Sequence, residues 1–311
     1  MRDLHRRLSA AGYSPAGHAD PTGWCEATTD AVRRFQRARG LFETGVCDEH
    51  TWNALVEASW TLGDRQLFLT SPNLRGDDVI ELQTALARLG FDCGRVDGIF
   101  GPLALRAVRM FQAEAGIIAD GVCGQETVRA LALLGDRSGS GPGVAMLREH
   151  EELLAGGGSI AGARLAVGQF GTFGPLSRLV AKDVRGRGAS VIVLDEPDPL
   201  AQAEAANAFQ ATAYVAFEAA EEPTVDVHFY QVPAFESARG HQLADTIASA
   251  LACHVGVRAA VSGMRLPVLR ETRMPAVHLV FGPVATYAEL APDIAVATAA
   301  AIEQWISGRE S

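Results

Sequence analysis

The sequence predicts a multidomain protein in which two small three-helix repeats precede an α/β domain with a mostly parallel sheet flanked by helices. Segment 32–55 recurs at 108–131 with a constant offset of 76 residues. A Gly-, Ser- and Pro-rich stretch then follows, and from residue 163 apolar runs alternate with helical stretches. Internal repetition, linker composition and strand–helix alternation each constrain the architecture. The predicted parts are repeats at 1–60 and 74–134, a linker at 135–145 and a domain at 159–308.

Bulk composition narrows the class of protein. With 311 residues, of which 48% are hydrophobic and 21% charged, the chain is long and apolar enough for two domains with cores. Its formal charge of -10 argues against a nucleic-acid binder, and we expect no nucleic-acid partner. No stretch reaches the ~18 consecutive apolar residues of a membrane helix, so the sequence predicts a protein that does not span a membrane.

Cysteine usage and the N-terminus indicate a compartment. The five cysteines are an odd number without a CxxC pair, which is typical of a reducing environment. The first residues, MRDLHRRLSAAGY, lack the apolar region and cleavage site of a secretory signal. We therefore expect a cytoplasmic protein. The alternative is an exported protein, in which an earlier start codon would add an export signal before this N-terminus.

Each repeat is predicted to contain three short helices. In the second repeat, leucines recur at helical spacing over 82–89 and Gly90 ends the helix. A second helix carries Phe111 and ends at Gly116, and a third begins after Gly124. The first repeat follows the same plan with a two-residue insertion in its first loop, where insertions are tolerated.

The second repeat reads LQTALARLGF, then VDGIFGPLA, then AVRMFQAEAGIIADGVCGQET. This pattern resembles the peptidoglycan-binding domain family, with its LQxxLxxLGF, VDGxFG and AVxxFQ segments. The first repeat fits loosely, because PTGWC replaces VDGxFG and puts Trp24 where Phe100 stands. The resemblance implies a possible muropeptide ligand. We favour the interpretation that the matching residues shape the core and turns instead of contacting a ligand.

From residue 163 the pattern predicts strand–helix alternation, and hence a mostly parallel sheet covered on both faces. The expected strands are 164–170, 189–197, 213–219, 225–232 and 275–282. The expected helices are 175–188, 200–211, 237–256 and 291–308.

The order of these elements, with LADTIASAL, PVLRETRMPAV and a final helix ending in QWI, resembles the Amidase_3 family of zinc-dependent N-acetylmuramoyl-L-alanine amidases over residues 163–307. Two repeats before such a domain, with TRMP and DDVxxLQ, resemble the CwlM-type actinobacterial family. There the amidase domain is understood as a cytoplasmic regulator of peptidoglycan precursor synthesis. The resemblance implies protein partners, such as the enolpyruvyl transferase acting on UDP-N-acetylglucosamine, or a muropeptide.

The resemblance also implies where the zinc ligands should stand. The family has a His after the first strand, a Glu opening the next helix and a His ending the third strand, with a catalytic Glu in the last strand. Here Gly171 stands near the first His position. The start of the next helix has only Ser177 and Arg178 where the metal-binding Glu is expected. Glu218 stands at the second His position and Val280 at the catalytic Glu position. We therefore expect no metal ligands, no cofactor and no catalytic residues.

A rearranged site is a competing possibility. His278 lies two residues before Val280 and shares its face of the strand, while Glu218 ends another strand, so a Glu218/His278 pair is conceivable. The competing interpretation is a histidine packed and hydrogen-bonded within the strand. His241 and Asp245 have helical i, i+4 spacing that could chelate a metal, but they lack a third ligand.

Two further groups of residues do not indicate a catalytic or metal-binding site. Cys253 and His254 are adjacent on a helix and point in different directions, which is unsuited to a nucleophile and its base. The acidic segment 195–198 follows a strand and is expected to be a solvated loop.

The favoured hypothesis is a non-catalytic amidase homologue that acts as a binding and regulatory protein in peptidoglycan precursor synthesis. One alternative is an amidase that cleaves the bond between N-acetylmuramic acid and L-Ala at a rearranged metal site. Another is an exported protein that binds the cell wall. Metal content distinguishes the first two hypotheses, and binding to insoluble peptidoglycan tests the third.

Overall fold

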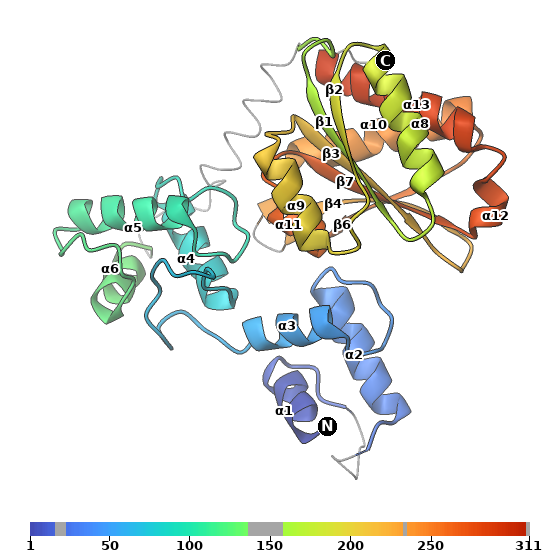
Figure 1. Ribbon diagram of the computed structural model, residues 1–311. Helices are drawn as coiled ribbons and strands as arrows, with labels where there is room; N and C mark the ends of the chain where they lie inside the picture. Colours follow the sequence, from blue (N-terminus) through green and yellow to red (C-terminus); the bar gives the residue numbers. More distant parts are fainter. Residues whose placement is uncertain (16–22, 136–157, 233–234, 309–311) are drawn as a thin grey trace. The chain divides into compact units, whose positions relative to one another are not determined.

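The structure, a computed structural model, describes residues 1–15, 23–135, 158–232 and 235–308. It divides into two units, of which the first holds both helical repeats and the second holds the α/β domain (Figure 1). The predicted linker at 135–145 begins at the last residue of a helix, and its remainder lies outside the described residues.

Each repeat contains the three helices that the sequence predicts. The first repeat has α1 (Arg2–Ala10), α2 (Glu26–Ala38) and α3 (Glu49–Glu57). The second has α4 (Asp77–Arg88), α5 (Pro102–Glu114) and α6 (Gln125–Gly135). Apolar side chains at helical spacing bury one face of each helix, and each repeat has its own core. The largest fully buried side chains in these cores are Phe35 in the first repeat and Phe100 and Phe111 in the second.

A buried glutamine in each repeat ties the loop after its second helix to the third helix. In the second repeat, Gln112 Nε2 lies 2.9 Å from Asp120 Oδ1 and 3.0 Å from both Val122 O and Thr127 Oγ1. Its Oε1 accepts from Gly121 N at 2.8 Å. In the first repeat, Gln36 makes the corresponding contacts with Thr44, Gly45, Val46 and Thr51. The repeated Gln and Thr are therefore structural residues.

The first repeat differs in structure where its motif differs in sequence. Phe100 is fully buried, whereas its counterpart Trp24 is 46% exposed and does not replace it in the core. Gln83 Oε1 accepts from two backbone N–H groups of the VDG turn, at 3.1 and 2.8 Å. Its counterpart His5 instead contacts Thr28 Oγ1 at 3.0 Å. The first repeat therefore lacks both the VDG turn and the glutamine that bonds to this turn in the second repeat.

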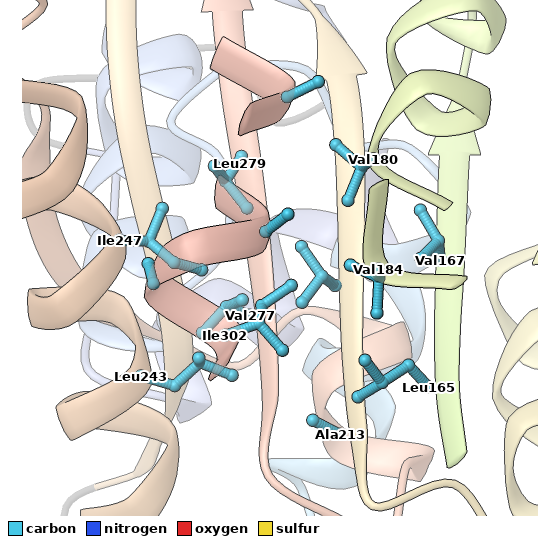
Figure 2. Packing of buried hydrophobic residues seen from close by; sticks show 14 of the residues in the cluster. Leu165, Val167, Val180, Val184, Ala213, Leu243, Ile247, Val277, Leu279 and Ile302 are labelled. Carbon is cyan, nitrogen blue, oxygen red and sulfur yellow. The ribbon is translucent and has the colours of Figure 1, made fainter. Parts of the chain in front are cut away.

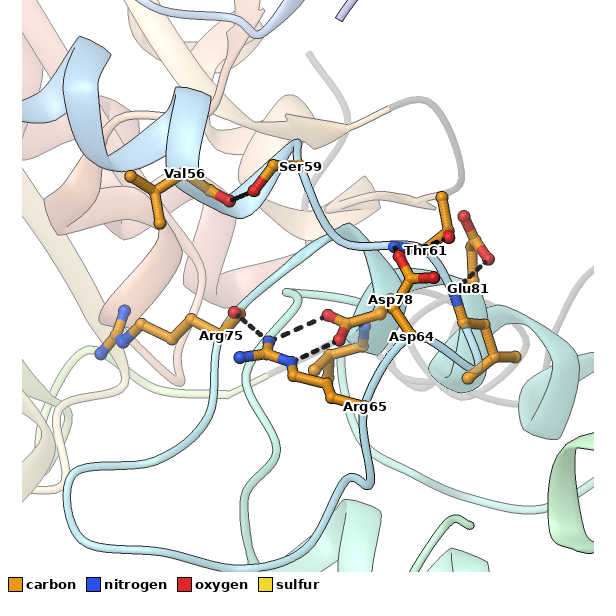
Figure 3. A network of polar contacts seen from close by, with 10 residues as sticks. Val56, Ser59, Thr61, Asp64, Arg65, Arg75, Asp78 and Glu81 are labelled. Atoms are coloured by element: carbon orange, nitrogen blue, oxygen red, sulfur yellow. Dashed lines mark hydrogen bonds and ion pairs between the residues drawn. The ribbon is translucent and has the colours of Figure 1, made fainter. Parts of the chain in front are cut away.

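A buried carboxylate joins the segment between the repeats to the second repeat. Asp78, on α4, accepts from Arg65 Nε at 2.7 Å, and Arg65 Nη2 donates to the backbone oxygen of Arg75 at 2.6 Å (Figure 3). The Arg65 guanidinium also lies 4.5 Å from the centre of the Trp60 ring. A buried carboxylate without such a partner would be strongly destabilising, so this pair constrains the path of the inter-repeat segment.

The α/β domain is built on a seven-stranded sheet. Its strands are β1 (Arg164–Phe170), β2 (Ser190–Leu194), β3 (Ala213–Ala219), β4 (Thr224–Val232), β5 (Phe235–Glu236), β6 (Ala260–Met264) and β7 (Ala276–Gly282). The order across the sheet is β2-β1-β3-β7-β4-β5, with β6 also paired to β4. The first four strands of this order are parallel, while β4 runs antiparallel to β7 and parallel to β6.

The helices of the domain lie on both faces of the sheet (Figure 1). They are α8 (Gly174–Gly186), α9 (Pro199–Ala208), α10 (Ala238–His254), α11 (Pro267–Glu271), α12 (Val284–Tyr287) and α13 (Ala291–Ser307). The sequence predicts β1 and β3 at their observed bounds, but it did not indicate β6 or the short helices α11 and α12. The sheet is therefore mixed. Its parallel strands β2, β1, β3 and β7 agree with the mostly parallel sheet that the sequence predicts.

The main core lies between one face of the sheet and the helices α8, α10 and α13. Val167, Val277 and Leu279 project from the strands into this layer, where they meet Val184 from α8 and Ile302 from α13 (Figure 2). Fully burying such a side chain contributes about 1.5–3 kcal/mol. This layer therefore fixes which face of each strand points away from the core.

Replacing Gln112 by Ala is expected to lower the free energy of unfolding of the second repeat by about 2–4 kcal/mol, because several buried polar groups lose their partner together. Hydrogen exchange of peptides from α5 and α6, measured in increasing urea, reports this change. The matched control is Glu114→Ala on the exposed side of the same helix, which should change stability by less than about 0.5 kcal/mol. Equal effects of the two substitutions would contradict the structural role of Gln112.

Candidate functional site at the carboxyl edge of the sheet

Four side chains form a row near the carboxyl ends of the parallel strands. The register pairs Phe170 of β1 with Glu218 of β3, and Glu218 with Val280 of β7. Val280 in turn pairs with Asp226 of β4. Directly paired residues project from the same face of a sheet, so the row lies on the face opposite the main core. We call these four residues the edge row.

A histidine two residues before Val280 on β7 contacts the edge row. His278 shares the face of Val280, and its Nε2 lies 3.0 Å from Glu218 Oε2. An imidazole N–H can donate and a carboxylate oxygen can accept at this distance. His278 is only 2% exposed, whereas the Glu218 side chain is 36% exposed. The Glu218/His278 pair that the sequence left open is therefore formed.

A second histidine extends this group across the sheet. His228 of β4 pairs directly with His278, and the two rings are stacked with centres 6.3 Å apart. His228 Nδ1 lies 2.8 Å from Ser262 Oγ on β6. Burial, together with the neighbouring His278, lowers the pKa of His228 to about 4. His228 is therefore neutral at pH 7.

Helix α9 covers the same face of the sheet, and its Gln202 lies beside the carboxyl end of β1, where Nε2 donates to Gln169 O at 2.9 Å. Tyr214 OH donates to Gln202 Oε1 of this helix at 2.7 Å, and burial raises the pKa of the Tyr214 hydroxyl. A Cβ atom at Gly168 would meet both side chains at 2.3 Å, so only glycine permits this close approach. In the edge row, Phe170, Glu218 and Asp226 are partly exposed, whereas Val280 is buried.

The remaining positions that the family resemblance singled out carry Gly171, Ser177 and Arg178, none of which is a usual zinc-ligating residue. Gly171 has φ +75, a conformation that favours glycine, and a Cβ atom there would lie 3.8 Å from Ala219 Cβ. Ser177 is fully buried in α8, and its hydroxyl donates to Gly174 O at 3.0 Å. Arg178 is exposed in the same first turns of the helix.

His241 lies between two carboxylates. Its Nδ1 is 2.6 Å from Glu236 Oε1 and its Nε2 is 3.5 Å from Asp245 Oδ2, while its ring stacks on Phe229 with centres 4.2 Å apart. The sequence pointed to His241 and Asp245, whereas Glu236 was missed. Its proximity comes from the turn between β5 and α10.

The other residues that the sequence set aside lie on the surface. Cys253 and His254 are both exposed at the end of α10. The acidic segment 195–198 is also exposed, and Asp198 accepts from Leu200 N as the N-terminal cap of α9.

Comparison with known proteins identifies the relatives of this chain. Residues 1–55 and 75–131 match the family model described as a putative peptidoglycan binding domain. The N-acetylmuramoyl-L-alanine amidase CwlM of Mycobacterium tuberculosis is 34% identical over 286 residues, which cover 81% of this chain and 70% of the relative. The chain belongs to the family of N-acetylmuramoyl-L-alanine amidases.

Other family members match the chain over shorter stretches. A probable N-acetylmuramoyl-L-alanine amidase of Bacillus licheniformis is 33% identical over 150 residues, or 43% of this chain and 42% of the relative. Among solved structures, the catalytic domain of CwlV from Bacillus (Paenibacillus) polymyxa var. colistinus aligns with 47% of this chain and 99% of that domain. It does so with 15% identity and a TM-score of 0.38.

The residues present do not fit the zinc ion of a catalytic amidase site. Such a site needs three protein ligands and a general base that can deprotonate the metal-bound water. Within the described ranges, no group of three or more His, Cys, Asp or Glu side chains is placed to hold a metal ion. Glu218 already contacts His278, and the apolar Val280 stands where the family resemblance leads us to expect the general base.

Acidification is expected to destabilise the α/β domain through His228. In the unfolded chain a histidine has a pKa near 6.5, whereas in the folded domain the pKa of His228 is about 4. The unfolded state therefore binds the proton more readily as the pH falls from about 6.5 to about 4. This linkage lowers the free energy of unfolding by up to about 3 kcal/mol.

Urea unfolding between pH 7.5 and pH 4.5, followed by hydrogen exchange of peptides from β4 and β7, measures this effect. His228→Gln should remove most of the pH dependence, while His254→Gln at an exposed position should retain it. A His228 imidazole that titrates near pH 6.5 by NMR would rule out this origin of the pH dependence.

Proposed function

We propose that this chain is a non-catalytic member of its family, which acts as a cytoplasmic binding and regulatory protein in peptidoglycan precursor synthesis. The observation that carries the proposal is the edge row. Glu218 and Val280, at the positions of a zinc ligand and the general base, are direct neighbours in the sheet. Neither the valine nor the contact between Glu218 and His278 can perform the family chemistry.

A binding role fits this scaffold because the residues of the main core are separate from those of the edge row. The main core between the sheet and α8, α10 and α13 is apolar and lies on the opposite face from the edge row. Loss of a catalytic site therefore leaves a folded domain with a partly exposed surface. We propose that its partners are proteins of precursor synthesis, such as the enolpyruvyl transferase acting on UDP-N-acetylglucosamine.

A second candidate function is hydrolysis at a rearranged site. The observation in its favour is the Glu218/His278 pair, which places a carboxylate and an imidazole 3.0 Å apart beside the family positions. Such pairs serve as acids and bases in other enzymes. A muropeptide would then be the substrate instead of a regulatory ligand.

Elemental analysis of the purified full chain and a muropeptide hydrolysis assay with added zinc distinguish the two functions. We expect no stoichiometric zinc and no cleavage, because no three ligands converge among the described residues. The amidase CwlL of Bacillus licheniformis, a relative 30% identical over 154 residues, is the positive control for the assay. One zinc ion per chain together with cleavage would show that the proposed function is wrong.

A further inference from the structure

The strand β2 forms one edge of the seven-stranded sheet. Within the described residues it pairs with β1 alone, and no strand lies on its other side (Figure 1). Ser190 N donates to Ala163 O of β1 at 2.8 Å. In a parallel pair, both backbone groups of every second residue point toward the neighbouring strand. Val191 and Val193 therefore direct their N–H and C=O groups away from β1, and we call this side of the strand the outer side of β2.

The sequence of β2 does not protect its outer side. The strand reads SVIVL, and its four apolar residues, 191–194, are all partly exposed. Edge strands are usually protected from pairing by charged side chains on the strand, by proline or by a bulge. This strand contains no charged residue and no proline, and its register with β1 is continuous. The outer side of β2 therefore presents backbone groups that a further strand can pair with.

Helix α8 places three basic side chains beside the outer side of β2. Arg178, Lys182 and Arg185 are all exposed and have i, i+4 and i+7 spacing, so they share one face of the helix. We call them the basic stripe. The helix packs on the face of the sheet that carries Val191 and Val193. Over seven residues a helix rises about 10 Å, which is close to the length of a five-residue strand, so the basic stripe is long enough to follow β2.

One contact shows that the basic stripe reaches the strand. Arg185 Nη2 donates to Val191 O at 2.9 Å, and this oxygen is one of the outward-pointing groups. A carbonyl oxygen has two lone pairs, so it can accept a second hydrogen bond. Among the described residues, no backbone or side-chain group bonds to the outward N–H and C=O of Val193. The outer side of β2 is thus accessible to donors and acceptors, and a basic side chain already lies against it.

We infer that the outer side of β2 binds an extended segment of a protein partner in which acidic residues alternate with apolar ones. The segment adds a strand to the sheet through hydrogen bonds with Val191 and Val193. Its residues opposite these two valines project toward α8, where acidic side chains form charge-assisted hydrogen bonds with the basic stripe. The residue opposite Ile192 projects from the other face, where an apolar side chain packs on Ile192 and Leu194.

Charge selects this occupant over a second copy of the chain. Antiparallel pairing of two β2 strands about a two-fold axis would place the basic stripes of both copies side by side, and like charges repel. An acidic segment neutralises the basic stripe instead. The exposed Asp195 and Glu196 directly follow the strand and repel further acidic residues. The acidic part of the partner segment is therefore confined to the 5 residues that lie alongside β2.

The test uses the full chain and the peptide acetyl-Glu-Val-Glu-Val-Glu-Val-amide as the probe. Amide shifts in an NMR titration give the affinity, and amide hydrogen exchange reports the location. At a peptide concentration of about ten times Kd, exchange at Val191 and Val193 should slow about tenfold. The Ile192 amide faces β1 and should change less than about twofold. A peptide of the same composition with three Glu before three Val is the control and should protect neither valine.

Two double variants test the charge. Arg178→Gln with Lys182→Gln should weaken binding of the alternating peptide about three- to tenfold, because two exposed charge pairs are lost. The matched control, Arg258→Gln with Arg273→Gln, removes the same charge at exposed positions outside α8 and should weaken binding less than about twofold. Unchanged circular dichroism shows that both variants fold.

Methylation of the peptide nitrogens tests the backbone bonds without altering the protein. N-methyl groups on the three Glu residues and on the three Val residues block opposite edges of an extended peptide. One of the two methylated peptides should bind and the other should not. Loss of binding with the methylated Glu residues indicates an antiparallel added strand, and loss with the methylated Val residues indicates a parallel one.

Four results would each overturn the inference. They are unchanged exchange at Val191 and Val193 with the peptide, equal effects of the two double variants, equal affinities of the two methylated peptides, and dimerisation that protects these amides without any peptide. The inference goes beyond the proposed function and does not depend on it. Zinc content and cleavage report on the edge row, whereas amide exchange in β2 reports on the outer side of that strand.

Discussion

The position of β7 between a parallel and an antiparallel neighbour governs the α/β domain. Val277 and Leu279 point into the main core, so His278 and Val280 must point to the other face. There β3 supplies Glu218, and β4 supplies a second histidine and a second carboxylate. A register shift of one residue would bring His278 into the apolar core, and the burial of both faces therefore fixes the edge row.

In the repeats, buried hydrogen bonds play a corresponding role. The same glutamine satisfies the same kinds of groups in both repeats, although only the second keeps the VDG turn. The motif residues therefore specify folding, and any ligand must be bound by exposed positions. Phe42 and Ile118 occupy equivalent places at the offset of 76 residues and are exposed in both repeats.

The described helices include none long and apolar enough to cross a membrane.

Much of the fold could be predicted because its signals are local. Helical leucine spacing and terminal glycines indicated the repeat helices, and continuous apolar runs indicated β1 and β3 at their observed bounds. The strand β6 was missed because AVSGM is short, contains a glycine and is mostly polar or small. Its role as a strand depends on pairing with β4, a long-range contact that no local pattern reveals.

The sequence by itself determined the repeats and the alternation of strands and helices, because residue identity and short-range periodicity suffice for these. Only the tertiary structure decided that His278 lies against Glu218 and that His228 and Asp226 join them. These residues come from three strands, and strand order and register bring them together. Order and register depend on burial of both sheet faces, which is a property of the whole domain.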